Sequence, residues 1–200
     1  VGSPLGNCLW SSTIVILGFG GIGEEIARRL AGFGVRIIAV SRHGPAGTRE
    51  RDPNVHVDLH VDASKMHEVV GEADYVVVAA PASPENIGLV DEALVSRMRP
   101  GVYIVNIARG PVIDYDALLV GLRNGLIAGA GIDVFWNEPF DPNDPILSEN
   151  VIATPHVGGS TESSLRGIGE AVAANIERIR LGNEPLCWVN PQAGRSRIDQ

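Results

Sequence analysis

The sequence predicts an α/β fold, in which helices cover both faces of a doubly wound parallel sheet. Short runs of apolar residues recur along almost the whole chain, and segments with a helical spacing of apolar residues lie between them. Runs that are apolar at every position are typical of strands buried on both faces, as in a parallel sheet. With 200 residues, 44% of them hydrophobic and 20% charged, the chain is long enough for one domain of substantial size.

The elements follow from these two patterns. The expected strands are Thr13–Leu17, Val35–Val40, Tyr75–Ala79, Val102–Val105, Ile127–Ile132 and Val151–Ile152. The expected helices are Ile22–Phe33, Ser64–Val70, Asp91–Met98, Tyr115–Arg123 and Leu165–Leu181, the last with Ser160 or Thr161 as its N-cap. The segment Arg42–Asp58 is polar and contains Pro and Gly, which predicts a loop with one short strand or none. We expect one domain over residues 1–182, followed by a return segment and C-terminal tail over residues 183–200.

Charge and cysteine content argue against several classes of function. Lys and Arg number 16 against 24 Asp and Glu, and the net charge of −8 argues against a sequence-independent nucleic-acid binder. No apolar stretch reaches the roughly 20 residues of a membrane-spanning helix, so no membrane partner is expected. Cys8 and Cys187 lack the spacing of metal or redox sites. We therefore expect no metal, and interpret both as buried, reduced thiols of a cytoplasmic protein, with an organelle left open.

A glycine-rich pattern, G-x-G-x-x-G, is formed by Gly18, Phe19, Gly20, Gly21, Ile22 and Gly23. The pattern alone is weak in a chain with 24 glycines, but here it follows a predicted strand and begins a predicted helix. Gly18 would make the tight turn, Gly20 would let the backbone approach a pyrophosphate, and Gly23 would let the helix pack against the strand. We expect these six residues to bind a dinucleotide at the helix N-terminus; the alternative is a glycine turn without a ligand.

The residues at the end of the second predicted strand indicate which dinucleotide the site prefers. Sites that prefer NAD place Asp or Glu there to bind the ribose 2′-hydroxyl. This sequence has Ser41, Arg42 and His43 instead. The missing carboxylate removes repulsion of a 2′-phosphate, and Arg42 can supply a charge-assisted contact. These residues therefore predict NADP(H), with NAD(H) less favoured; the alternative is that Arg42 is only a solvated loop charge.

Three residues suited to one chemistry follow three different predicted strands, and they are Arg109, Glu138 and His156. Ligands of parallel sheets bind at the carboxyl ends of the strands. An Arg fork can hold a carboxylate, and a His can exchange the proton that accompanies a hydride, with a neighbouring Glu to fix the ring. The alternative for each residue is a solvated loop position. The remaining histidines lie in polar surroundings and are interpreted as surface or loop residues: His43, His56, His60 and His67.

The surrounding motifs resemble the D-isomer-specific 2-hydroxyacid dehydrogenase family, from about residue 13 to residue 190. The stretch GVYIVNIARGPVIDYDA is similar to the family signature around its substrate-binding arginine, which implies this role for Arg109. GAGIDVFWNEP resembles the segment with the catalytic glutamate, which implies Glu138. PHVGGST resembles the segment with the acid/base histidine, which implies His156.

The same resemblance implies a Rossmann-type domain and further cofactor contacts. Asp133 would contact the nicotinamide amide. The other residues expected at the cofactor are Ala80, Pro81, Ile107, Ala108, Gly158 and Gly159. The residues 41–43 resemble the NADPH-using branch that includes glyoxylate/hydroxypyruvate reductases. Formate dehydrogenases of the family have Gln where Glu138 stands, so that branch is disfavoured.

Members of that family have a second domain that closes over the cofactor and completes the substrate site. Only about twelve residues precede Thr13, so we expect most of that domain to be absent from this chain, and a homodimer to belong to a full-length form. Two functions stay open. The first is an NADPH-dependent reductase of a 2-keto acid such as glyoxylate or hydroxypyruvate, which in reverse oxidises a D-2-hydroxy acid. The second is a catalytically silent dinucleotide-binding module that resembles the family's transcriptional corepressors.

Overall fold

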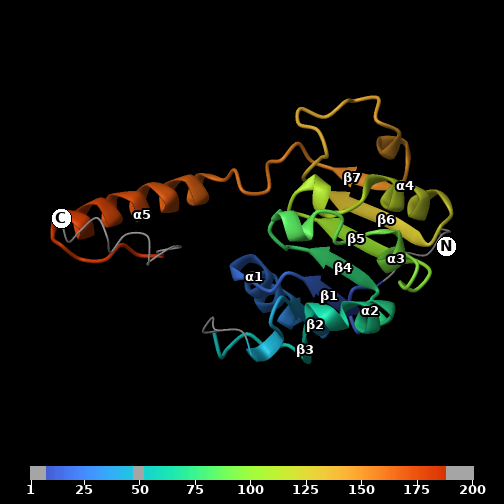
Figure 1. Cartoon of the computed structure of the whole chain (residues 1–200), viewed down its shortest axis with the longest axis horizontal. Coiled ribbons are helices and arrows are strands. Elements are labelled where there is room, and N and C mark those ends of the chain that lie inside the picture. Colours follow the sequence, from blue (N-terminus) through green and yellow to red (C-terminus); the bar gives the residue numbers. More distant parts are fainter. Residues whose placement is uncertain (1–7, 47–51, 188–200) are drawn as a thin grey trace. The chain divides into compact units, whose positions relative to one another are not determined.

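The computed structural model describes residues 8–46 and 52–187. A seven-stranded sheet with the order β3-β2-β1-β4-β5-β6-β7 forms its centre (Figure 1), and all neighbouring strands pair in parallel. The strands are β1 (Thr13–Leu17), β2 (Arg36–Ser41), β3 (Leu59–Asp62), β4 (Tyr75–Val78), β5 (Val102–Asn106), β6 (Ile127–Ile132) and β7 (Val151–Ala153). The predicted doubly wound α/β fold is therefore confirmed.

The helices are α1 (Gly21–Leu30), α2 (Met66–Val69), α3 (Glu92–Val95), α4 (Tyr115–Arg123) and α5 (Glu162–Arg180). Short 3-10 helices are η1 (Ala31–Phe33), η2 (Gly44–Ala46), η3 (Ala63–Lys65), η4 (Val70–Glu72), η5 (Pro84–Asn86), η6 (Gly110–Val112) and η7 (Pro145–Ser148). Three predicted helices are thus shorter and more broken than expected. In the first, Ile22–Phe33, α1 ends at Leu30 and η1 follows. The segment predicted as Ser64–Val70 consists of η3, α2 and the start of η4, and Asp91 is the N-cap of α3, where its side chain accepts a hydrogen bond from the N–H of Leu94.

The strand β3 was not among the expected strands, and it begins just after the predicted loop Arg42–Asp58. It lies at the edge of the sheet, and only Val61 of its four residues is buried. A half-exposed edge strand lacks the continuous apolar run that identifies the central strands. The missing signal is therefore a direct result of its position.

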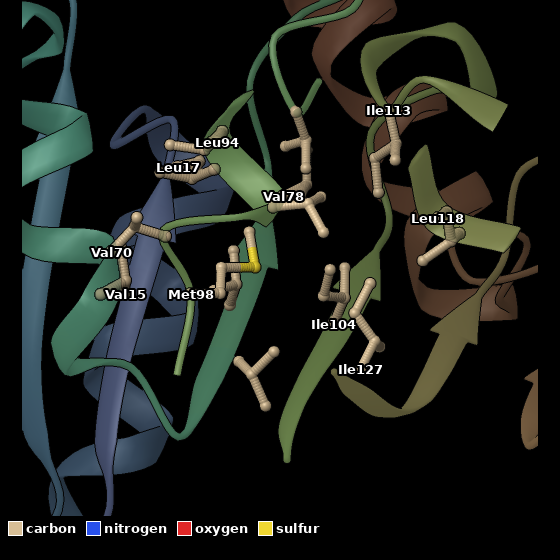
Figure 2. Close-up of a cluster of buried hydrophobic side chains, with 14 of the residues drawn as sticks. Val15, Leu17, Val70, Val78, Leu94, Met98, Ile104, Ile113, Leu118 and Ile127 are labelled. Carbon is tan, nitrogen blue, oxygen red and sulfur yellow. The ribbon is translucent and has the colours of Figure 1, made fainter. Parts of the chain in front are cut away.

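Two hydrophobic clusters fill the space between the sheet and the helices. The larger cluster joins β1, β4, β5 and β6 to α2, α3 and α4, and Figure 2 shows its side chains, among them Leu17, Val78 and Ile104. The smaller cluster joins β1 and β2 to α1 through Ile16, Ala27 and neighbours. Figure 1 accordingly shows α1 on one side of the sheet and α2, α3 and α4 on the opposite side. The carboxyl ends of the strands are thereby fixed at one edge, where the loops of the site begin.

The chain divides into two compact units, Val1–His156 and Val157–Gln200. The first holds the whole sheet with α1 to α4, and the second holds α5, whose N-cap is Thr161, as the sequence allowed. The expected domain boundary after residue 182 stays a prediction, and residues 188–200 of the expected tail lie outside the described residues.

Three expectations from composition concern single features of the fold. Cys8 and Cys187 are exposed, so their predicted burial is wrong; both lie near the ends of the described chain, where few elements can cover them. Within residues 8–46 and 52–187, no helix combines the length and apolar character needed to cross a membrane. In the same ranges, no group of three or more His, Cys, Asp or Glu side chains is placed to hold a metal ion.

Candidate active site

The phosphate loop between β1 and α1 depends on two glycines. Gly18 has φ +99°, and a Cβ placed on it would lie 2.3 Å from the backbone nitrogen of Ala80, in the loop after β4. A Cβ on Gly23 would lie 2.4 Å from the carbonyl oxygen of Gly18. Neither position can hold a side chain, because backbone atoms on the far side cannot move away as a flexible side chain could. The loop therefore brings bare backbone N–H groups and the start of α1 together, which is the arrangement that binds a phosphate.

A cleft of about 590 Å³ opens beside this loop. It lies at the carboxyl ends of β2, β1 and β4. The strand order reverses between β1 and β4, and such a switch point is where doubly wound sheets bind dinucleotides. Its volume is within the range of small-molecule sites. The residues that line it are Leu17, Gly18, Phe19, Gly20, Val40, Ser41, Arg42, Ala63, Met66, Ala79, Ala80, Pro81, Glu85, Asn86 and Leu89. A glycine cradle, a helix N-terminus and an apolar floor together fit a nicotinamide dinucleotide.

The structure brings only part of the expected cofactor set to this cleft. Gly18, Phe19, Gly20, Ser41, Arg42, Ala80 and Pro81 line it. Gly21 and Ile22 are on α1 and line a separate shallow depression with Glu25, and Ile22 is 58% exposed. His43 is exposed in the turn after β2, and Ile107 and Ala108 lie beyond β5. Gly158 and Gly159 belong to the second compact unit, where both are exposed.

His60, which the sequence led us to interpret as a surface or loop residue, lies on a strand and contacts both predicted parts of the cofactor site. The Nε2 atom of His60, on β3, lies 2.8 Å from the hydroxyl oxygen of Ser41. Its ring packs edge-on against Phe19 of the phosphate loop, with 5.4 Å between ring centroids. Only the pairing of β3 with β2 brings His60 to this place, so no local sequence signal could have found it.

Across the mouth of the cleft, Arg42 faces a carboxylate. Its guanidinium lies 3.7 Å from the carboxyl group of Glu85 in η5, and both side chains are largely exposed. The neighbouring Ser83 hydroxyl, the Glu85 backbone and the charge of Arg42 hold the pKa of Glu85 below its ordinary value. Glu85 is therefore ionised at neutral pH and competes with any other anion for Arg42.

Arg109 follows β5 in a loop that a buried asparagine organises. Asn106 is fully buried; its side-chain oxygen accepts a hydrogen bond from the N–H of Ala108 at 3.0 Å, and its amide nitrogen donates to the carbonyl of Arg109 at 3.1 Å. A Cβ on Gly110 would lie 2.2 Å from the carbonyl group of Phe135, so this loop packs directly against the loop after β6. Arg109 is exposed at the edge of the sheet, and one nitrogen of its guanidinium, Nη1, donates a hydrogen bond to the carbonyl of Ala108 at 2.5 Å.

Glu138 and His156 form the hydrogen-bonded pair that the sequence suggested. The Nδ1 atom of His156 lies 2.8 Å from one carboxyl oxygen of Glu138, and the N–H of Phe135 donates to the other oxygen at 3.1 Å. These two contacts, with the charges of His156 and Arg109 nearby, hold the pKa of Glu138 below its ordinary value. His156 has φ +56°, which is uncommon for a residue other than glycine and is often found at functional sites. Three loops after adjacent strands thus bring Arg109, Glu138 and His156 to one edge of the sheet.

The Glu138 loop is anchored on its far side by aromatic residues. The indole nitrogen of Trp136 donates to the carbonyl of Ile113 at 2.6 Å, and its ring stands at 88° to that of Tyr115. The hydroxyl of Tyr115 donates to Asp144 at 2.6 Å. Burial and this carboxylate raise the pKa of Tyr115 to about 12. Trp136 therefore supports the loop rather than reaching out of it.

Asp133, at the end of β6, has a partner in the loop after β7. The hydroxyl of Thr154 donates to a carboxyl oxygen of Asp133 at 2.5 Å. The backbone carbonyl of Thr154 also accepts a hydrogen bond from the N–H of His156 at 3.0 Å. One threonine thus connects the expected nicotinamide contact to the expected proton carrier, a link that the sequence did not indicate.

Comparisons with known proteins agree with this geometry. Residues 2–158 match the family model described as D-isomer specific 2-hydroxyacid dehydrogenase, NAD binding domain. A glyoxylate reductase from Thermococcus gammatolerans is 38% identical over 188 residues, which cover 94% of this chain and 54% of that protein. A glyoxylate reductase from Pyrococcus furiosus is 37% identical over 193 residues, with 96% and 55% covered. The chain spans about half the length of the curated relatives it matches.

Solved structures give the same result. A glyoxylate reductase from Paecilomyes thermophila superimposes with a TM-score of 0.80 at 30% identity, over 94% of this chain and 55% of that chain. A D-isomer specific 2-hydroxyacid dehydrogenase from Xanthobacter autotrophicus, in complex with NADPH and MES, gives 0.77 at 31% identity, over 92% and 72%. The chain therefore belongs to the D-isomer-specific 2-hydroxyacid dehydrogenases, whose NAD binding domain its residues 2–158 match.

Proposed function

We propose that this protein acts as an NADPH-dependent reductase of a small 2-keto acid such as glyoxylate or hydroxypyruvate, and in reverse oxidises a D-2-hydroxy acid. The observation that carries the proposal is the Glu138–His156 pair, 2.8 Å apart, on the same edge of the sheet as the exposed Arg109. The relatives named glyoxylate reductase support the choice of substrate class. A cytoplasmic location and a homodimer of a full-length form stay predictions.

Each side chain has a separate task in this reaction. A nicotinamide, when bound, supplies the hydride that reaches the keto carbon. Protonated His156 gives a proton to the keto oxygen from Nε2, because Glu138 holds Nδ1 and fixes the ring. The Glu138 carboxylate also stabilises the charged ring, and its lowered pKa keeps it ionised throughout the neutral range. Arg109 binds the substrate carboxylate with its planar fork and so orients the neighbouring carbonyl.

The cofactor itself would be held by the cleft and by Asp133. The phosphate loop would bind the pyrophosphate at the start of α1, and Asp133 would accept a hydrogen bond from the nicotinamide amide. NADP(H) is favoured over NAD(H) because Ser41 and Arg42 stand at the cleft where NAD-preferring sites have an acidic residue. A relative in complex with NADPH supports this preference.

The test follows NADPH consumption with glyoxylate and with hydroxypyruvate, for this chain and for His156→Asn. Asn is the matched replacement, because it tolerates the left-handed backbone of residue 156 and has no group that titrates. We expect the variant to lose about 100-fold or more in rate, as removal of a general acid commonly does, while its affinity for NADPH stays unchanged. Equal rates for the two proteins would overturn the role of His156. Tight NADPH binding with no consumption by either protein would instead favour the silent dinucleotide-binding module.

A further inference from the structure

We infer that His60 is a positioning residue for cofactor choice: it orients the Ser41 hydroxyl so that Ser41 donates a hydrogen bond to the 2′-phosphate of NADP(H). The inference rests on the proposed preference for NADPH and extends it to a residue outside the cleft lining. It starts from the position of His60 on β3, a strand that contributes no residue to the walls of the cleft.

The sheet register places the two side chains together. In the pairing of β2 with β3, His60 is opposite Ala39 and Asp62 is opposite Ser41. Side chains of paired residues point to the same face, and alternate residues of a strand share that face. His60 therefore lies on the α1 side of the sheet, one step before Ser41, which explains the 2.8 Å between its Nε2 and the serine hydroxyl.

The ring of His60 is held in this direction by the phosphate loop. Phe19, which is only 7% exposed, meets the imidazole edge-on at 62° and 5.4 Å. The imidazole consequently contacts two segments that border the cleft: the phosphate loop and the end of β2. A solvated surface histidine would contact neither, so its interpretation as a surface or loop residue does not describe its contacts.

The number of protons available for donation explains how His60 affects phosphate binding. A serine hydroxyl has a single proton to donate, whereas a phosphate offers only acceptor oxygens. If the imidazole accepted that proton, Ser41 would present only lone pairs to the phosphate. When Nε2 carries a hydrogen and donates to Ser41, the serine proton, which in this structure is directed at the carbonyl of Gly44 over a long 3.4 Å contact, is free to turn to the phosphate oxygen. A bound 2′-phosphate therefore selects the form of His60 that donates, and His60 in turn makes Ser41 a donor.

The contrast between two substitutions isolates this effect. His60→Phe keeps a ring of similar size against Phe19 but has no hydrogen-bond donor. His60→Gln gives up the ring and keeps a donating N–H group. Ser41→Ala removes the hydroxyl through which His60 acts, and the double variant Ser41→Ala/His60→Phe shows whether the two side chains act together.

Dissociation constants for NADPH and for NADH are measured with each folded variant. His60→Phe and Ser41→Ala should each weaken NADPH binding by about tenfold, the loss of a hydrogen bond to a charged group, and leave NADH within about twofold. The double variant should be no weaker than Ser41→Ala alone, and His60→Gln should restore most of the affinity. If His60→Phe does not fold, the comparison of His60→Gln with Ser41→Ala carries the test.

Three outcomes would overturn the inference. Equal losses for NADPH and NADH in His60→Phe would mean a purely structural role, and additive losses in the double variant would separate His60 from Ser41. A His60→Gln protein as weak as Ser41→Ala would show that the donor is not what matters. A fourth outcome, wild-type protein that binds NADH as tightly as NADPH, would overturn the proposed cofactor preference on which the inference rests. The first three outcomes leave that preference standing, so the two failures are distinguishable.

Discussion

Replacement of Asn106 by alanine tests how the loop of Arg109 is held. The side chain makes two hydrogen bonds, to the N–H of Ala108 and to the carbonyl of Arg109, and is fully buried. Each bond contributes about 1 kcal/mol net, and the buried N–H of Ala108 would lose its acceptor at a further cost of about 1–2 kcal/mol. We therefore expect Asn106→Ala to lower the free energy of unfolding by about 3–4 kcal/mol.

The chain contains a matched control for this substitution. Asn124 also accepts a hydrogen bond from the N–H two residues further on, that of Leu126 at 2.9 Å, but it is exposed. Water can replace its side chain, so Asn124→Ala should cost about 1 kcal/mol or less. Urea unfolding followed by circular dichroism measures both free energies. Equal losses for the two variants, or a loss below about 1 kcal/mol for Asn106→Ala, would refute the reasoning from burial.

Three further substitutions probe the site and its supports. Gly110→Ala should slow or abolish NADPH consumption with little change in NADPH affinity, because the Cβ of the alanine would collide with the backbone of the loop after β6. Unchanged turnover would contradict that close contact. Glu85→Gln should tighten NADPH binding by about two- to fivefold at low salt, because Arg42 loses a competing carboxylate, and should leave the affinity for NADH unchanged. Weaker binding of NADPH by this variant would mean that Glu85 supports the site. The pKa of Tyr115 is raised from 10.0 to about 12, so its contribution to stability is present below pH 10 and is lost as the pH rises through 12. Tyr115→Phe should therefore lower the free energy of unfolding by about 1–3 kcal/mol near neutral pH, because the hydrogen bond to Asp144 is lost. In thermal or urea unfolding, the stability of the variant should decline less steeply than that of the wild type between pH 10 and 12. Parallel stability curves for the two proteins would be inconsistent with the raised pKa.

Sequence patterns predicted the architecture because burial leaves a strong signature. Every expected strand is present within a residue or so of its predicted ends, since strands such as β1 and β4 are apolar on both faces. The glycines of the phosphate loop were found for a related reason. Gly18 and Gly23 satisfy local backbone demands that recur wherever a strand, a tight turn and a helix follow one another.

The supporting contacts of the site were not predictable in the same way. His60 reaches Ser41 through the pairing of an edge strand, and Glu85 reaches Arg42 from a loop after another strand. Both contacts depend on tertiary placement, and neither residue type has a local pattern that separates it from a solvated side chain. Conversely, Ile22 is in the predicted glycine motif and yet lies on the outer face of α1, since helical geometry turns successive residues away from each other.

The short edge strand β7 is the weak point that determines when Glu138 and His156 lose their alignment. It has three residues, pairs with β6 at the edge of the sheet, and leaves Ile152 78% exposed. A slip of one residue along β6 would carry the following loop about 3.3 Å and reverse which way each side chain of the strand points. A displacement of that size would break the 2.8 Å hydrogen bond between the imidazole and its carboxylate. Heat or denaturant that detaches β7 from β6 would thus abolish proton transfer while the central strands are still intact. Faster amide hydrogen exchange at Val151–Ala153 would detect this local unfolding.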